Sequence, residues 1–247
     1  MYQSFAQVYD ALMAQVDYAA WAGHYDTLMQ LCQVKKGARC VECACGTGSI
    51  TLPLRKMGYQ MTGVDLSGEM LAIAMEKARS QGLGVPFIRQ DMCSLSLPRK
   101  TECILATCDG VNYLTQPAQV QKFFAAAFDG LKTGGALIFD ISSEYKLKNT
   151  LGNNTLTCDE EEFAYIWHNR FNEKNACVDI SLSIFRKRAD GAFDRLEEAQ
   201  TQRAHTIAEL RGWLEAAGFV QVQVFGNRRL TAPRQNDERL HFCARKP

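Results

Sequence analysis

The sequence predicts an α/β fold, in which a doubly wound, mostly parallel sheet carries helices on both faces. Two observations predict it. Between residues 39 and 140, short apolar runs alternate with helix-compatible stretches, and parallel strands need crossover connections of this kind. After residue 145 the alternation stops, and strand-like runs separated by turn signals follow. This change predicts a small antiparallel β insertion after the fifth strand.

Seven segments have the short, apolar character of sheet strands. In chain order they are residues 39–43, 60–64, 85–89, 102–107, 136–140, 220–225 and 239–244. The expected helices are residues 1–35, 49–57, 68–81, 116–131 and 206–217. Ser67 and Thr206 have N-cap side chains, while Gly58 and Gly218 follow helix ends. Within the insertion we expect strands at residues 163–171, 177–186 and 194–204, joined by turns at 172–175 and 189–191.

Composition limits the functions that the chain could have. Its 247 residues fit one large domain or a domain with an insertion, and 47% of them are hydrophobic. The net charge of +1 does not require a nucleic-acid or acidic-membrane partner, although a local basic patch could still exist. No export signal and no apolar run of about 20 residues is visible, so we expect a cytoplasmic protein without a membrane partner.

The ten cysteines suggest reduced thiols rather than a disulfide framework or a metal site. Several of them lie inside apolar strand-like runs, where a thiol behaves as a small buried apolar group. Cys40 and Cys43 have C-x-x-C spacing, but a structural zinc site needs a second pair of ligands, which the sequence lacks. We therefore expect no metal.

The segment V-E-C-A-C-G-T-G at residues 41–48 is a glycine-containing turn between a strand and a helix. Gly46 and Gly48 allow a ligand to approach the backbone closely. Asp65 ends the second strand, 19 residues after Gly46, where an acid accepts from ribose hydroxyls. Thr51 replaces the third glycine of a dinucleotide turn, and Glu42 suits an ammonium group better than a phosphate. These features favour S-adenosylmethionine over a nicotinamide dinucleotide.

Ordered motifs also resemble those of the class I S-adenosylmethionine-dependent methyltransferases. They are the turn at residues 41–48, G-V-D-L-S-G-E-M-L at 63–71, R-Q-D-M at 89–92 and L-K-T-G-G-A-L-I-F-D at 131–140. The opening Y-Q-S-F-A-Q-V-Y-D further resembles a YqeM-like bacterial subgroup. The resemblance implies a seven-stranded, Rossmann-like core of residues 1–145 and 206–247, in which residues 1–35 form a helical cover. Residues 146–205 would be the insertion, a lid over the methyl acceptor.

The resemblance assigns roles along the cofactor. Glu42 and the backbone of Ala44, Cys45 and Gly46 would hold the methionine part, together with Cys108. Asp65 would bind the ribose, Leu66 and Met70 would flank the adenine, and Asp91 and Met92 would hydrogen-bond its edge. Tyr9, Tyr18 and Trp21 would cover the cofactor, although aromatic residues on a helix are also common in cores. Glu42 and Ala44 depart mildly from the aspartate and glycine that are common at these positions.

Methyl transfer is an in-line displacement, so a base is needed only when the acceptor must lose a proton. Asp109, at the end of the fourth strand, and His205 are the candidate catalytic residues. His205 also fits as a polar residue before a helix, and Arg203, a candidate for binding an acidic group, fits as a structurally paired side chain. The aromatic residues that could line an acceptor pocket are Tyr113, Tyr145, Tyr165 and Trp167.

The sequence leaves the acceptor open. The fourth strand ends in T-C-D-G-V-N-Y-L, without the N-P-P-[YF] pattern of base or glutamine methylation and without a Pro-Cys pair for cytosine C5 chemistry. A small-molecule nitrogen or oxygen acceptor is the first hypothesis. The alternatives are an RNA or protein acceptor, a catalytically silent S-adenosylmethionine-binding protein, and more remotely a nicotinamide dehydrogenase. A macromolecular acceptor predicts a basic patch, for which the local cluster is Arg228, Arg229, Arg234 and Arg239.

Overall fold

Five adjacent parallel strands make up most of a seven-stranded sheet in the computed structural model, which describes residues 5–247. The spatial order is β10-β11-β5-β4-β1-β2-β3, and β11 runs antiparallel to both of its neighbours. The strands are β1 Arg39–Cys43, β2 Gln60–Asp65, β3 Phe87–Arg89, β4 Thr101–Ala106, β5 Leu131–Ser142, β10 Val220–Gly226 and β11 Arg239–Arg245. The predicted doubly wound, mostly parallel sheet is confirmed.

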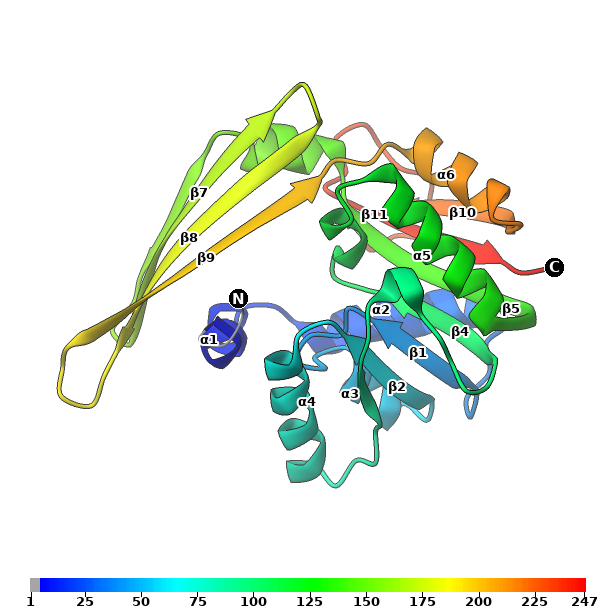
Figure 1. The fold of residues 1–247 in the computed structure, drawn as a ribbon, viewed down its shortest axis with the longest axis horizontal. Helices are drawn as coiled ribbons and strands as arrows, with labels where there is room; N and C mark the ends of the chain where they lie inside the picture. The colour runs from blue at the N-terminus through cyan, green and yellow to red at the C-terminus, as the bar shows by residue number, and fades with distance from the viewer. Residues whose placement is uncertain (1–4) are drawn as a thin grey trace.

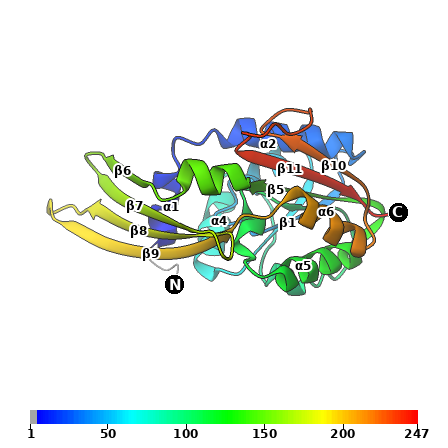
Figure 2. The same cartoon turned by 90° about the horizontal axis from the view of Figure 1, so that it is seen from above.

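Helices cover both faces of this sheet, as strand alternation requires (Figure 2). On β5, Leu137 and Phe139 belong to the core cluster that includes the helices on one side. Ala136 and Ile138 belong to the cluster on the opposite side. Helices α5 and α6 pack on the first side, and α2 and α3 pack on the second. The helices are α1 Phe5–Leu12, α2 Tyr18–Leu31, α3 Thr51–Lys56, α4 Gly68–Ser80, α5 Pro117–Gly130 and α6 Ile207–Ala216.

Strand β1 is the point at which the strand order reverses. It pairs with β2 on one side and with β4 on the other, so that Cys43 lies between Val64 and Ala106. The carboxyl ends of these three strands therefore meet at one edge of the sheet. In open α/β sheets, the crevice beside such a reversal is where ligands bind.

The insertion forms a separate antiparallel sheet in the order β6-β7-β8-β9. Its strands are β6 Thr155–Asp159, β7 Phe163–Asn172, β8 Cys177–Lys187 and β9 Phe193–Arg203. Figure 1 shows this sheet extending away from the seven-stranded one, to which β9 leads back through α6. Ile180, Leu182 and Ile184 alternate with more exposed residues along β8, so one face of the sheet is apolar and turned inward.

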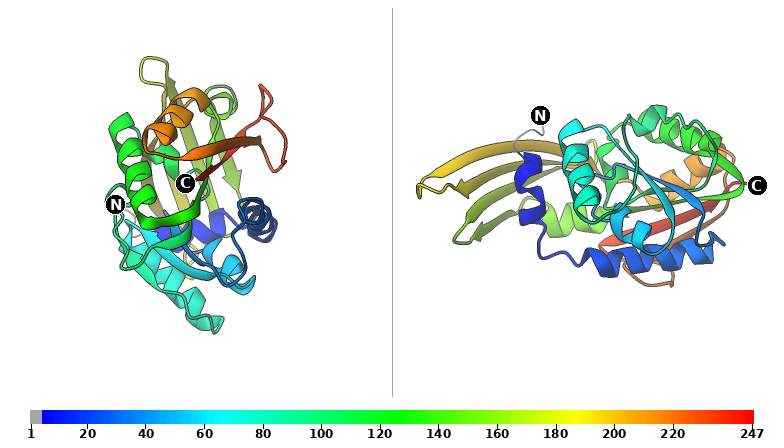
Figure 3. Two further views of the ribbon diagram at one scale, coloured as in Figure 1. Left: turned by 90° about the vertical axis from the view of Figure 1, so that its right-hand side faces the viewer. Right: turned by 90° about the horizontal axis from the view of Figure 1, so that it is seen from below.

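The N-terminal segment holds the two sheets together. Residues 13–17 divide the predicted helical cover into α1 and α2, and Asp17 begins α2 by accepting from the Ala20 backbone N–H at 2.9 Å. Residues 1–4 of that cover lie outside the described part of the chain. Helix α1 lies between the inner face of the inserted sheet and α4, as the two views in Figures 1 and 3 agree. Its Val8 belongs to one apolar cluster with Met70 of α4 and Ile184 of β8.

Several predicted boundaries were wrong. Strand β5 begins at Leu131, where the sequence predicts a helix end, because it pairs irregularly with Thr101 before reaching the apolar run. A π-helical turn, Lys146–Leu151, and strand β6 were not predicted. Strand β6 is a short edge strand whose side chains are mostly exposed, and its alternation of Leu156 and Cys158 with polar residues spans only five positions. No helix within residues 5–247 is long and apolar enough to cross a bilayer.

The packing of α1 between the inserted sheet and α4, here called the clamp, gives a testable expectation. Ile184 is fully buried, and Ile184→Ala removes side-chain atoms that join the inserted sheet to α1 and α4. We expect local opening of α1 and of the inserted strands to become easier by about 2–5 kcal/mol. Native-state hydrogen exchange measures it, with Leu156→Ala on exposed β6 as the matched control. Unchanged exchange in α1 would contradict this account of the clamp.

Candidate functional site

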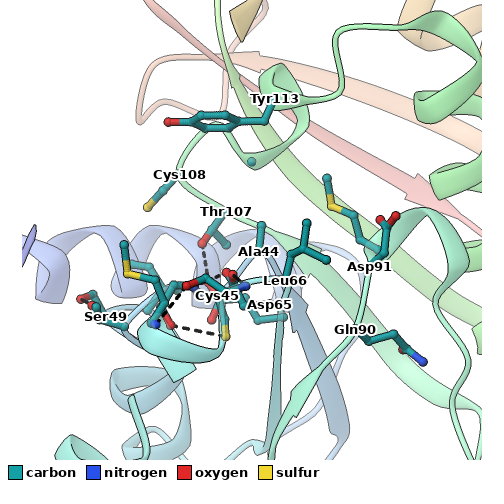
Figure 4. A pocket seen from close by; sticks show the side chains of 18 of the residues that line it. Ala44, Cys45, Ser49, Asp65, Leu66, Gln90, Asp91, Thr107, Cys108 and Tyr113 are labelled. Atoms are coloured by element: carbon teal, nitrogen blue, oxygen red, sulfur yellow. Dashed lines mark hydrogen bonds between the residues drawn. The ribbon is translucent and has the colours of Figure 1, made fainter. Parts of the chain in front are cut away.

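A cavity of about 620 Å³ lies at the carboxyl ends of β1, β2 and β4. Figure 4 shows Ala44 and Asp65 on one side of it, and Cys108 and Tyr113 on the opposite side. Of the predicted cofactor-binding residues, those that line the cavity are Tyr9, Tyr18, Glu42, Ala44, Cys45, Gly46, Asp65, Leu66, Met70, Asp91, Met92 and Cys108. The chain thus brings together residues that are spread over 100 positions of sequence.

The turn after β1 needs a backbone that ordinary residues adopt with difficulty. Ala44 has φ +52°, Gly46 +53° and Gly48 +76°, all in the left-handed region. A Cβ on Gly46 would meet no atom within 4 Å, so this glycine faces open space in the cavity. A Cβ on Gly48 would lie 3.3 Å from the Cβ of Ala74, so this glycine permits close packing of α4. The positive φ of Ala44 explains why glycine is favoured at that position.

Glu42 is a buried carboxylate at the floor of the cavity. Its two oxygens accept hydrogen bonds from the hydroxyl groups of Thr51 and Thr107. Burial raises the pKa of Glu42 to about 7, and the nearby charge of Asp65 adds to the increase while the two threonine hydrogen bonds oppose it. A buried carboxylate that is costly to ionise is suited to receive a positive ligand group.

Asp65 connects the first turn to the start of α4. Its Oδ2 accepts from the Gly46 N–H at 2.8 Å, and its Oδ1 accepts from the Ser67 N–H at 2.9 Å. Burial raises the pKa of Asp65, while these backbone donors lower it. Each carboxylate oxygen keeps a second lone pair. The carboxylate can therefore accept from two neighbouring hydroxyl groups, as on a ribose.

The far end of the cavity has the groups that an adenine edge requires. Asp91 begins a short 3₁₀ turn, Met92–Ser94, and its Oδ1 accepts from the Cys93 N–H at 2.8 Å. Leu66, Met70 and Met92 provide apolar surface around this end. From one end to the other, the cavity offers a buried carboxylate, a diol acceptor and an apolar slot with an acid. This donor and acceptor set fits S-adenosylmethionine.

A second cavity, of about 350 Å³, lies between the first one and the inserted sheet. The residues that line both cavities are Tyr9, Tyr18, Cys108, Tyr113 and Gln200. The hydroxyls of Tyr9 and Tyr18 hydrogen-bond to each other, and that of Tyr113 donates to Gln200 Oε1 at 2.8 Å. These five residues form the junction of the two cavities.

A buried ionic network supports the wall of the second cavity. Asp140 ends the apolar part of β5 and is fully buried. It accepts from the hydroxyl of Tyr25, from the Asp109 N–H at 3.1 Å and from Arg239 at 2.6 Å. The same Arg239 also donates to the side chain of Asp109, whose other oxygen accepts from Gln202 at 2.8 Å. Cys108 and Asp109 both have positive φ, 54° and 56°, so this network holds an unusual turn in place.

The predicted acceptor residues are divided by the structure. Tyr113, Tyr165, Trp167 and Asp109 line the second cavity, and so does Trp21, which does not line the first. The structure places the remaining predicted residues, Tyr145, Arg203 and His205, outside both cavities.

The three displaced residues have physical reasons for their positions. Arg203 follows Gln202 on the other face of β9, pairs with Glu209 at 2.6 Å and lies over the ring of Trp213. His205 packs edge-on against Trp213, and burial lowers its pKa to about 4, so its ring is neutral at neutral pH. Tyr145 precedes the π-helical turn and lies with His205 in a separate hollow.

Several polar residues of the second cavity were not predicted. They are Ser142, Lys146, Glu198, Gln200, Gln202 and Arg239. Arg239 was assigned to a basic cluster, but it is paired with Asp109 and Asp140, and Arg229 of the same cluster pairs with Asp237. Two of the four cluster arginines are therefore neutralised.

The geometry of Asp65 predicts a specific loss in cofactor binding. We expect Asp65→Asn to weaken binding of S-adenosylhomocysteine by about 10- to 100-fold, because two charge-assisted hydrogen bonds are lost. Titration calorimetry measures this, and Asp129→Asn on α5 is the control. Competition experiments compare adenosine with 2′,3′-dideoxyadenosine. If Asp65 recognises the ribose, Asp65→Asn should lose the preference for adenosine. If its role is purely structural, the variant should keep that preference.

The pKa of Glu42 predicts how cofactor affinity depends on pH. An ammonium group binds the ionised form, so protonation of Glu42 competes with it below a pH of about 7. We expect the affinity for S-adenosylhomocysteine to rise by up to roughly tenfold per pH unit from pH 5 to 7, and then to level off. Calorimetry from pH 5 to 8 tests this. Glu42→Gln should flatten the profile, and exposed Glu76→Gln should keep it.

Comparison with known proteins agrees with the site. Residues 40–135 match a family model described as a methyltransferase domain. The chain is 32% identical to YqeM of Bacillus subtilis, a protein named as a methyltransferase, over 100% of this chain and 97% of that one.

Solved structures are similar over nearly the whole chain. An S-adenosylmethionine-dependent methyltransferase from Clostridium acetobutylicum has a TM-score of 0.89 and 31% identity, and the match covers 99% of this chain and 98% of the other. CalS10, an amino pentose methyltransferase from Micromonospora echinaspora solved with S-adenosylmethionine bound, shares the fold with a TM-score of 0.75 and 19% identity, over 97% of both chains. The cavity, the relatives and the fold agree, and the chain belongs to the S-adenosylmethionine-dependent methyltransferases.

Proposed function

We propose that this enzyme methylates a nitrogen or oxygen atom of a small molecule, which binds in the second cavity. The observation that carries the proposal is the junction of the two cavities at Tyr9, Tyr18, Cys108, Tyr113 and Gln200. A nucleophile held in the second cavity would meet the cofactor at this junction. In-line displacement requires the nucleophile to approach opposite the leaving group, and the proposal places that approach here.

Residues 146–205 act in this proposal as the lid over the acceptor. The inner face of the inserted sheet contributes Tyr165, Trp167, Ile180 and Leu182 to the second cavity. These apolar side chains exclude water from the reacting atoms. A volume of about 350 Å³ suits a small molecule. The small-molecule acceptor class named for CalS10, which has the same fold, is consistent with this size.

The chemistry needs little from the protein beyond position. S-adenosylmethionine supplies a methyl group on a positively charged sulfur, which is already a good leaving group. In the proposal, Glu42 and the first turn hold the amino-acid end of the cofactor. Asp109 has both oxygens engaged, by Arg239 and Gln202, so it acts as a positioning residue for the cavity wall.

Trp167 provides a test that separates acceptor binding from cofactor binding. It lines the second cavity but not the first. We expect Trp167→Ala to reduce methyl transfer into low-molecular-weight products by about tenfold or more, because an aromatic wall is lost, while S-adenosylhomocysteine binds as before. The measurement is transfer from S-adenosylmethionine with a tritiated methyl group into a metabolite extract, with Ile166→Ala, exposed on β7, as the matched control.

The partition of the label distinguishes the alternatives. Label in the small-molecule fraction that falls in Trp167→Ala supports the proposal. Label confined to RNA or protein would favour a macromolecular acceptor instead. No transfer to any fraction, with S-adenosylhomocysteine still bound, would indicate a binding protein without transfer activity.

A further inference from the structure

Glu198 is a carboxylate buried in the wall of the second cavity, at the middle of β9. Only 5% of this residue is exposed. Alternation along β9 turns Glu198, Gln200 and Gln202 to the inner face of the inserted sheet, where all three line the cavity. Glu198 lies opposite Leu182 of β8, which lies opposite Trp167 of β7. Its surroundings across the sheet are therefore apolar and aromatic.

One oxygen of this carboxylate has no partner among the described residues. Glu198 Oε1 is inaccessible to solvent and accepts no hydrogen bond, while Gln200 is the side chain that hydrogen-bonds to the carboxylate. The other lining acid, Asp109, is paired with Arg239. No described cation forms an ion pair with Glu198. A buried acceptor without a partner is costly, and it indicates a group that a ligand satisfies.

The neighbouring groups decide which ligand chemistry fits. Burial raises the pKa of Glu198, while the Gln200 hydrogen bond and the positive charge of the amino terminus lower it. An anionic ligand would be repelled by the ionised carboxylate and would offer Oε1 no hydrogen. An ammonium group offers both a positive charge and donors, and its bond to a carboxylate is stronger than that of a neutral hydroxyl. The rings of Tyr165 and Trp167 in the same cavity add faces that attract cations.

We propose that Glu198 selects acceptors that carry an amine, by binding the ammonium group in the second cavity. The position of Gln200 supports this assignment. Gln200 lies two residues from Glu198 on the same face and belongs to the junction with the cofactor cavity. An ammonium group held by Glu198 would therefore lie two residues along β9 from Gln200, at the junction. The inference rests on the proposed function in one respect: it assumes that the methyl acceptor binds in the second cavity.

Matched pairs of small probes test the assignment without knowledge of the natural acceptor. The probes are benzylamine with benzyl alcohol, and cyclohexylamine with cyclohexanol. Each is titrated into the full-length protein saturated with S-adenosylhomocysteine, and ligand-observed NMR gives the dissociation constants. We expect each amine to bind about tenfold or more tightly than its alcohol, and Glu198→Gln to reduce that ratio to about threefold or less.

The control is Glu197→Gln. Glu197 is the adjacent residue, on the opposite face of β9, exposed and paired with Arg195 at 2.6 Å. It should keep the amine preference of the wild type. Because Glu198 does not line the cofactor cavity, unchanged S-adenosylhomocysteine affinity in Glu198→Gln verifies that the variant is folded.

Two results would overturn the inference: no preference for amines in the wild type, including no amine binding, or the same preference in Glu198→Gln. Failure of the proposed function has a separate signature, because label transfer into small molecules is measured with other reagents. If amine selectivity depends on Glu198 but no label is transferred to small molecules, the inference about Glu198 stands and the proposed reaction is wrong.

Discussion

The buried carboxylate of Asp140 is the interaction on which the arrangement of both cavities depends. It lies at the end of β5 and joins four parts of the chain: Tyr25 of α2, the backbone of Asp109 after β4, Arg239 of β11 and β5 itself. Because Asp140 is fully buried, loss of Arg239 would leave its charge without a counter-ion, which in proteins costs about 3–5 kcal/mol. The turn with two consecutive positive φ angles, Cys108 and Asp109, persists because this network holds it. The junction of the cavities is built on that turn.

The cofactor side of the site could be predicted because its determinants are local. Ala44, Gly46, Asp65 and Asp91 each lie at the end of a strand or within three residues after it, and the alternation of strands and helices fixes where strand ends meet. The strand order then brings these residues together, which no single motif could predict. Two features favour S-adenosylmethionine over a nicotinamide dinucleotide. The charge of Glu42 suits an ammonium group better than a phosphate, and the turn lacks the third glycine of a dinucleotide site. None of these inferences required knowledge of contacts between distant segments.

The acceptor side could not be predicted in the same way. Residues 194–203 read D-R-L-E-E-A-Q-T-Q-R, which is polar on both faces, so the sequence does not show that Glu198 is turned inward. Register with Leu182 decides it, and a shift of one residue would turn Glu197 inward instead. Arg239 resembled part of an exposed basic cluster because its partners, Asp109 and Asp140, are 130 and 99 residues away. Burial by long-range pairing leaves no local trace.

The wall shared by the two cavities has a thermodynamic consequence. Tyr9 comes from α1 and Tyr18 from α2, and each lines both cavities. A ligand in one cavity that orders these side chains lowers the entropy that must be lost when the other cavity fills. Linkage makes the effect reciprocal, so in the proposed function cofactor and acceptor change each other's affinity by the same factor. The helical cover at the start of the chain would then be the element through which the two binding equilibria are coupled.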